Sequence, residues 1–106
     1  MKKNMQTLSK AEERIMAIIW LEGGEVYTAT KLLEGLETKF GIKRARTTLA
    51  TFLTRMQAKG YISSEREGRC SIIKALVDKD DYIAMKLQNM KEVFDLSPDK
   101  IYDLAE

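Results

Sequence analysis

Residues 47–60, TTLATFLTRMQAKG, combine an amphipathic helical pattern with an unusual polar face. Apolar side chains recur at Leu49, Phe52, Leu53 and Met56, the spacing of a helix face that packs on a core. The opposite face carries threonines and one arginine but no carboxylate, whereas a solvated face usually mixes both charges. It suits close approach to a polyanion, because hydroxyls and arginine reach phosphates and base edges. A surface helix that simply lacks acids is the alternative.

The hydrophobic period changes from 3.6 to 2 at Gly60, which we expect to end the helix as a left-handed cap. Alternating segments over 61–66 and 70–75 are joined by a Glu-Gly turn signal, which predicts a β-hairpin. Arg66 and Arg69 lie at its tip. A hairpin in this position is typical of a wing, which commonly brings arginines to a minor groove or to the DNA backbone.

Two further helices are expected upstream. Ser9 and Glu12 form a capping-box signature, which predicts a helix over about 10–21. A second helix is expected over 28–39, capped by the threonine at its start. The linker at 41–46, GIKRAR, carries three cations to the entrance of the threonine-rich helix, whose N-terminal N–H groups also favour a phosphate. This order of elements is a helix-turn-helix followed by a wing.

Positive charge is concentrated around the threonine-rich helix. Residues 39–74 hold nine basic and two acidic side chains, net +7, whereas residues 1–38 are net −1 and residues 75–106 net −4. Such segregation is typical of nucleic-acid binding, although a basic segment can also be an ordinary solvated surface.

The C-terminal part, residues 78–106, is predicted to be helical. Asp78 is expected to cap a helix over about 79–94, and Ser97-Pro98 predicts the start of a short last helix. These helices lie beyond a complete small core, so their apolar faces need a partner, either the domain itself or a second copy. We expect a homodimer. The predicted dimerisation residues are Tyr82, Ile83, Leu87, Met90, Val93, Phe94, Ile101 and Leu104.

Composition restricts the chemistry. The chain has 106 residues, no histidine and a single cysteine, Cys70, so the usual zinc sites and Ser-His-Asp or Cys-His catalysis are excluded. There is neither an apolar run long enough to cross a membrane nor the apolar region of a secretory signal. We therefore predict a cytoplasmic protein that is not an enzyme and has no cofactor, metal or membrane partner.

Three blocks, LSKAEERIMAIIW, TTLATFLTRMQAKGYIS and REGRCSIIKALVDKDDY, resemble the penicillinase repressor family of bacterial winged-helix repressors. The resemblance covers roughly residues 8–82 and implies transcriptional repression. It places Thr47, Thr48, Thr51 and Arg55 on the recognition helix and residues 66–69 in the wing. Family members usually have a longer dimerising tail. The chain also lacks the Asn-Phe bond at which some members are cleaved and the cysteine cluster of the copper-responsive branch.

The expected architecture is mainly α with a small β-hairpin: a winged helix-turn-helix domain over 1–77, then a helical dimerisation element over 78–106. The expected function is repression by sequence-specific binding of duplex DNA at a palindromic operator. A winged-helix protein-interaction module is the alternative. The predicted DNA-binding residues are Lys43, Arg44, Arg46, Thr47, Thr48, Thr51, Arg55, Arg66 and Arg69.

Overall fold

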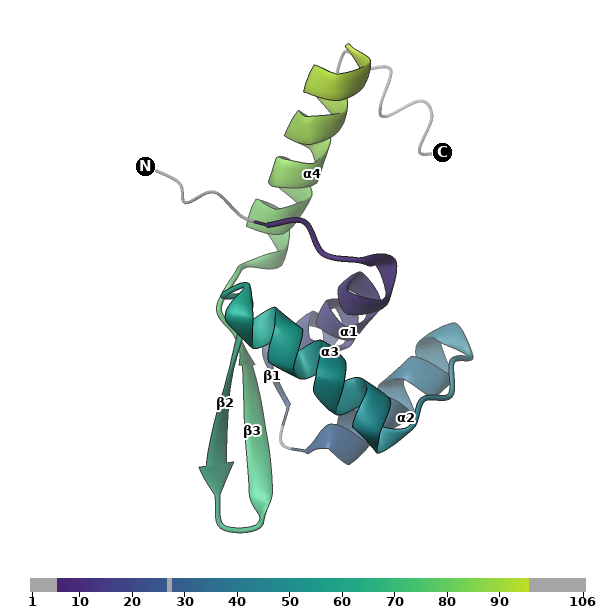
Figure 1. Ribbon diagram of the computed structural model, residues 1–106, viewed down its shortest axis with the longest axis vertical. Helices are drawn as coiled ribbons and strands as arrows, with labels where there is room; N and C mark the ends of the chain where they lie inside the picture. Colours follow the sequence, from purple (N-terminus) through teal and green to yellow (C-terminus); the bar gives the residue numbers. More distant parts are fainter. Residues whose placement is uncertain (1–5, 27, 96–106) are drawn as a thin grey trace.

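The computed structural model describes residues 6–26 and 28–95 of the chain. Helices α1, α2 and α3 pack against a small antiparallel sheet with strand order β1-β3-β2, and α4 follows the sheet (Figure 1). This is the predicted winged-helix architecture. The elements are α1 (Lys10–Leu21), β1 (Glu25–Val26), α2 (Ala29–Phe40), α3 (Arg46–Ala58), β2 (Ile62–Glu67), β3 (Cys70–Ala75) and α4 (Lys79–Phe94).

The helix boundaries follow local signals in the sequence. Both bonds of the capping box form at α1, because the Ser9 hydroxyl accepts from the Glu12 N–H at 3.2 Å while the Ser9 N–H donates to the Glu12 carboxylate at 2.8 Å. At α2 the Thr28 hydroxyl accepts from the Lys31 N–H. Gly41 ends α2 in the left-handed conformation, with φ 68°. The predicted caps of both helices are confirmed.

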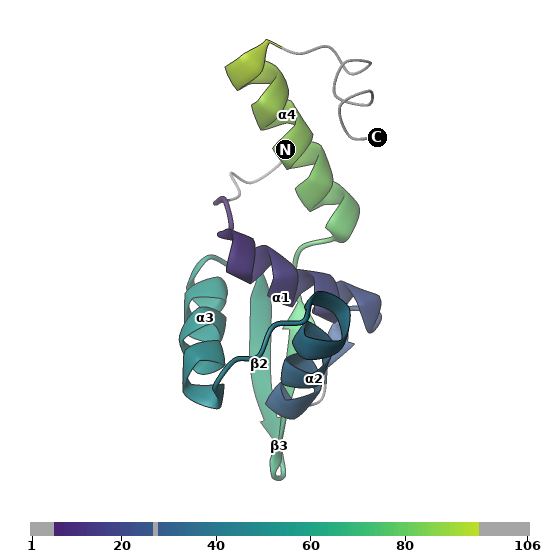
Figure 2. The ribbon, with the colours of Figure 1, turned by 90° about the vertical axis from the view of Figure 1, so that its right-hand side faces the viewer.

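One hydrophobic core holds the helices and the sheet together. Figure 2 shows α1 lying across the upper ends of α2 and α3, with the sheet behind them. From α3, Leu49 and Met56 are fully buried in this core, and Phe52 and Leu53 pack against its edge. The apolar stripe predicted for this helix is confirmed. Its burial orients the opposite, polar face toward solvent.

The hairpin β2–β3 is the predicted wing. Ile62 pairs with Ala75 at its base and Glu67 with Cys70 at its tip, and Gly68 takes a positive φ of 63° in the turn. The side chains of Ile62 and Ile73 are buried, but the segment 64–70 is exposed throughout. The distal half of the hairpin therefore extends beyond the core (Figure 1).

Helix α4 and the wing tip lie at opposite ends of the molecule (Figures 1 and 2). Asp78 caps α4 as predicted, its carboxylate accepting from the Asp80 N–H at 3.2 Å. The last helix expected after Ser97 lies outside the described residues. None of the helices in the described part of the chain is long and apolar enough to cross a membrane.

Candidate nucleic-acid interface

The outer face of α3 is exposed and contains no carboxylate. Thr47, Thr48, Thr51 and Arg55 are all exposed: Thr47 and Thr51 lie opposite the buried Leu49, and Thr48 and Arg55 flank them. They span about two helical turns, and two turns of helix fit within the major groove of B-DNA. The burial of the apolar stripe therefore presents this set of side chains together.

Two threonine hydroxyls of α3 donate hydrogen bonds to the backbone of their own helix. The Thr51 hydroxyl donates to the Thr47 carbonyl at 3.1 Å, and the Thr54 hydroxyl donates to the Ala50 carbonyl at 2.9 Å. Such a hydroxyl keeps lone pairs but has used its proton. In this conformation Thr51 can therefore accept a hydrogen bond, as from an adenine or cytosine amino group, while its methyl group suits the thymine methyl.

The N-terminus of α3 is open to an anion. Ala45 is the N-cap, no side chain caps the helix, and its first turn contains no acid. The first N–H groups of such a helix have no intrahelical partner and carry the positive end of the helix dipole. Arg46 lies at this end, and its guanidinium donates to the Thr30 hydroxyl, which ties the start of α3 to the start of α2. A backbone phosphate matches this end of the helix.

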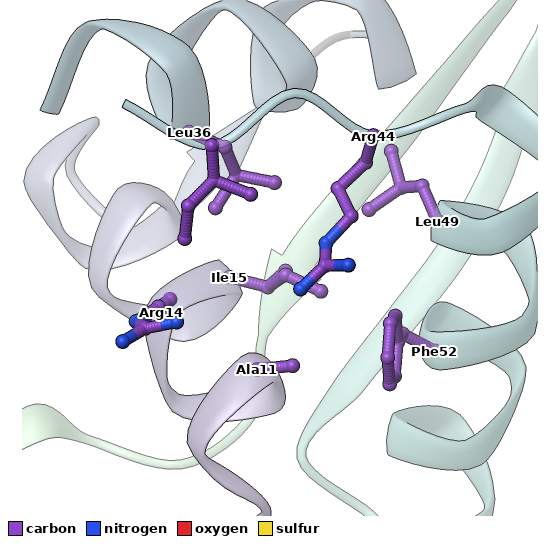
Figure 3. A pocket seen from close by; sticks show the side chains of 8 residues that line it. Ala11, Arg14, Ile15, Leu36, Arg44, Leu49 and Phe52 are labelled. Atoms are coloured by element: carbon purple, nitrogen blue, oxygen red, sulfur yellow. The ribbon is translucent and has the colours of Figure 1, made fainter. Parts of the chain in front are cut away.

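Arg44 takes an orientation that the sequence pattern did not indicate. Its guanidinium points into a small pocket between α1 and α3, toward Ile15 and Phe52 (Figure 3). Arg14 of α1 lines the same pocket, and its guanidinium lies 6.0 Å from the centre of the Phe40 ring. In this orientation the Arg44 side chain lines the pocket, although the residue as a whole is exposed.

The wing separates its charges onto two faces. Side chains alternate along β2, so Arg66 shares a sheet face with Ile62, whose side chain is buried against the helices. Glu65 and Glu67 lie on the other face. Arg69 follows the glycine of the turn and is exposed. The wing therefore presents arginine on the side where α3 lies and its carboxylates on the far side.

Some of the nine cations in residues 39–74 have acidic partners. Lys59 contacts Glu12 at 2.7 Å and Lys74 contacts Glu25 at 3.6 Å, whereas the exposed Lys43 lies 3.8 Å from Glu37. A separation of that length between exposed groups contributes little and is easily exchanged. The five arginines of residues 39–74 form no ion pair with any residue in 6–26 or 28–95. They are Arg44, Arg46, Arg55, Arg66 and Arg69.

A buried ion pair fixes the C-terminal end of α3. Glu12 is only 2% exposed and bonds Lys59, the C-cap residue of α3, which also donates to the Thr7 carbonyl at 3.2 Å. Burial alone raises the pKa of the Glu12 carboxyl, but the bonds from Lys59 and the Ser9 N–H outweigh it and hold that pKa below its ordinary value of 4.5. Glu12 is thus ionised at neutral pH and anchors the helix.

The residues expected to mediate dimerisation fall into three groups. Ile83, Leu87, Met90, Val93 and Phe94 are exposed along α4. Ile101 and Leu104 lie outside the described residues. Tyr82 requires a correction, because it is 5% exposed and belongs to the core of its own chain, where its hydroxyl bonds Glu13.

Sequence reasoning missed three parts of this arrangement: Arg14 beside Arg44, Lys59 as the partner of Glu12, and the bond between Tyr82 and Glu13. Only Glu12 carried a signal, as the third residue of the capping box, and that signal does not indicate its second partner.

In the described ranges no group of three or more Cys, Asp or Glu side chains could hold a metal ion.

Together, a helix-turn-helix with an acid-free exposed face and a wing that presents arginine on the same side define a winged-helix DNA-binding protein. The comparisons agree. Residues 8–101 match the family model described as penicillinase repressor. The chain belongs to the penicillinase repressor family, and its class is that of DNA-binding transcriptional repressors.

Solved structures extend this similarity. A solution structure of the DNA-binding domain of the repressor BlaI is 26% identical, with a TM-score of 0.60, over 76% of this chain and 94% of that one. The monomeric form of Bacillus licheniformis BlaI, solved in complex with the blaP half-operator, is 25% identical with a TM-score of 0.59 and the same coverage. A winged-helix DNA-binding protein from STIV shares the fold at 11% identity and a TM-score of 0.60, over 82% of this chain and 96% of that one. No curated protein sequence matches the chain.

Proposed function

We propose that this protein represses transcription by binding, as a homodimer, to a palindromic duplex-DNA operator that it recognises by sequence. One observation carries the proposal: the exposed face of α3 has no carboxylate and lies on the side of the sheet to which the wing directs Arg66. A surface with this charge and width matches a major groove and its flanking phosphates. Membership of the penicillinase repressor family supports it.

Each part of this surface has a distinct role. Residues at the groove contact bases, residues at the helix entrance hold the phosphate backbone, and the wing contacts the flanking backbone or minor groove. Arg55 is the one long cation among the base-contacting residues, and a guanidinium can bind guanine through two hydrogen bonds. The base-contacting residues are Thr47, Thr48, Thr51 and Arg55; the phosphate-binding residues are Lys43, Arg44 and Arg46; the wing residues are Arg66 and Arg69.

Helix α4 supplies the dimer interface. Val93 is 73% exposed and Phe94 64%, and with Ile83, Leu87 and Met90 they form an apolar surface on one helix. Exposed apolar surface of this kind marks an interface, and cyclic dimers are the commonest closed assembly. The related BlaI binds a half-operator as a monomer, which supports one winged-helix domain per half-site. We assign residues 1–77 to DNA binding and residues 78–106 to dimerisation.

A charge placed within the apolar surface tests the dimer. Leu87→Asp would bury a carboxylate in the interface, and we expect it to produce monomers in sedimentation equilibrium at concentrations where the wild type is dimeric. Gln88→Asp adds the same charge at the adjacent exposed position and should leave the dimer intact. Equal association of all three proteins would exclude α4 from the interface.

The experiment that tests the function is a selection from random duplex DNA with purified protein near physiological salt. We expect a two-fold palindrome whose half-sites lie about one helical turn, roughly 34–36 Å, apart. A single unpaired half-site would contradict the homodimer but keep base recognition. No enriched sequence at all would contradict sequence-specific binding and favour a protein-interaction module.

A further inference from the structure

The connection between the DNA-binding domain and α4 is short, and two hydrogen bonds fix its backbone to the domain. Three residues, Leu76–Asp78, join β3 to α4. The Leu76 N–H donates to the Tyr61 carbonyl at 2.8 Å, and the indole N–H of Trp20 donates to the Val77 carbonyl at 3.0 Å. Because both backbone groups are fixed to the domain, the connection has little freedom of its own.

The first turns of α4 are fixed to α1 by one carboxylate. The Tyr82 hydroxyl donates to Glu13 Oε2 at 2.5 Å, and Lys86 Nζ lies 3.0 Å from the same oxygen. Tyr82 and Lys86 are one helical turn apart, so Glu13 contacts two successive turns of α4. The Tyr82 ring also packs between the rings of Trp20 and Tyr61, with centroids 5.9 Å and 5.7 Å away.

Glu13 is suited to this role because it is ionised. Partial burial raises the pKa of its carboxyl, but the hydrogen bonds from Tyr82 and Lys86 outweigh that effect and hold the pKa below its ordinary value. On the other side, burial and the bond to Glu13 raise the pKa of the Tyr82 hydroxyl, which therefore keeps its proton as a donor at any physiological pH. A neutral donor and a cation thus share one carboxylate.

The C-terminal part of α4 extends away from the rest of the domain (Figures 1 and 2). Leu87, Met90, Val93 and Phe94 are exposed, so the direction of this projecting part depends on the contacts made by the first two turns. The distance along the helix from Tyr82 to Phe94 is about 18 Å, at 1.5 Å per residue. A tilt of roughly 10° at Tyr82 would move the far end by about 3 Å, close to the 3.4 Å rise of one base pair.

We propose that Glu13, through Tyr82 and Lys86, is a positioning residue that fixes the angle of α4 and thereby selects the spacing between operator half-sites. The inference rests on the proposed homodimer, because α4 carries its interface. Glu13 lies on α1 and belongs to no part of the DNA-contacting surface, so it acts on the geometry of the pair of domains and leaves the contacts of each half-site unchanged.

Tyr82→Phe tests this with the smallest change, since it keeps the buried ring and removes the hydroxyl that bonds Glu13. Glu13→Ala removes both contacts that this carboxylate makes with α4, to Tyr82 and to Lys86. The matched control is Tyr61→Phe, which removes a hydroxyl from the same aromatic cluster; that hydroxyl bonds the Gln6 carbonyl and not α4. Affinity is measured for the selected operator with its half-site spacing altered by one or two base pairs, and for an isolated half-site.

For the wild type and Tyr61→Phe we expect a single preferred spacing, with a loss of about tenfold or more for two added base pairs. For Tyr82→Phe and Glu13→Ala we expect this preference to fall to roughly threefold or less, with half-site affinity unchanged within about twofold. If both variants keep the preference of the wild type, the role of Glu13 is refuted while the dimer stands. If the wild type itself has no preferred spacing, the homodimer proposal fails, and this inference fails with it.

A second measurement reports the helix angle without DNA. Cys70 is exposed at the wing and is the single cysteine of the chain, so one added cysteine, Lys91→Cys on α4, gives a spin-label pair across the joint. Dilution with unlabelled protein suppresses the distances between labels on two different protomers, so the distance within one chain is measured. We expect a narrow distribution in the background carrying only Lys91→Cys and a broadened or shifted one when Tyr82→Phe is added. Identical distance distributions would refute the proposal that the bond between Tyr82 and Glu13 fixes the angle of α4.

Discussion

Replacing Lys59 with methionine would leave the Glu12 carboxylate buried without its cation. Glu12 is 2% exposed, and the Lys59 side chain, at 24%, is the one member of the pair in contact with water. Breaking a fully buried pair typically costs about 3–5 kcal/mol. Because solvent reaches this site through Lys59, we expect roughly 2–3 kcal/mol, which for a domain of this size lowers the melting temperature by about 10–20 °C.

The loss of stability caused by Lys59→Met should be larger at neutral pH than in acid. In the wild type the pKa of Glu12 lies below 4.5, so the stability contributed by its ionised form is complete above pH 4.5 and is lost as pH falls through the folded-state pKa. Without Lys59, burial becomes the dominant influence, and we expect the pKa of Glu12 to rise above 4.5. The folded variant then gains stability as pH falls toward 4.5. The difference between the two proteins is therefore largest near neutral pH and shrinks in acid.

Urea denaturation at pH 7 and pH 4 measures this difference. Lys31→Met is the control, because Lys31 is an exposed lysine of a neighbouring helix with no ion pair in the described part of the chain. The double variant Glu12→Gln/Lys59→Met should recover part of the loss, since no charge remains buried. The reasoning is refuted if Lys59→Met and Lys31→Met have the same free energy of unfolding at both pH values.

Two other predictions concern the helix packing and the wing. Gly35→Ala should destabilise the protein by roughly 1–3 kcal/mol, because the added Cβ would lie 2.6 Å from Cγ2 of the buried Ile18. This clash should outweigh the better helix propensity of alanine. Thermal unfolding measures the change in stability, and a stabilised variant would contradict the prediction. Arg69→Ala should reduce the slope of log affinity against log salt by about one per half-site if Arg69 contacts a phosphate. An unchanged slope would remove Arg69 from the interface.

Most of the fold could be predicted from local sequence. The capping box at Ser9, the glycine at residue 41 and the change of period at Gly60 each act within a few residues, and the structure confirms the element boundaries that they imply. Gly60 takes a positive φ of 82°, as expected for a left-handed helix end. Such signals are readable because caps and turns depend on neighbouring residues.

The contacts that the sequence did not predict join residues far apart in the chain. The bond between Glu12 and Lys59 spans 47 residues, and that between Glu13 and Tyr82 spans 69. Periodicity placed Tyr82 on the apolar face of α4 correctly but could not indicate whether that face met its own domain or a partner. In the structure the first turns meet α1, which buries Tyr82 and leaves the later residues exposed. Likewise, local pattern gave no orientation for the Arg44 side chain.

The claim that the exposed face of α3 recognises bases is tested most directly with Arg55→Ala. Affinities of the wild type and the variant are measured for the selected operator and for every single-base-pair substitution within it. We expect the variant to lose about 1–3 kcal/mol and to become indifferent at one position of each half-site, while its preferences elsewhere are kept. Gln57→Ala, about 200° around the same helix, should keep every preference. Uniform weakening of Arg55→Ala across all sequences would contradict base recognition by Arg55 and reduce its role to phosphate binding.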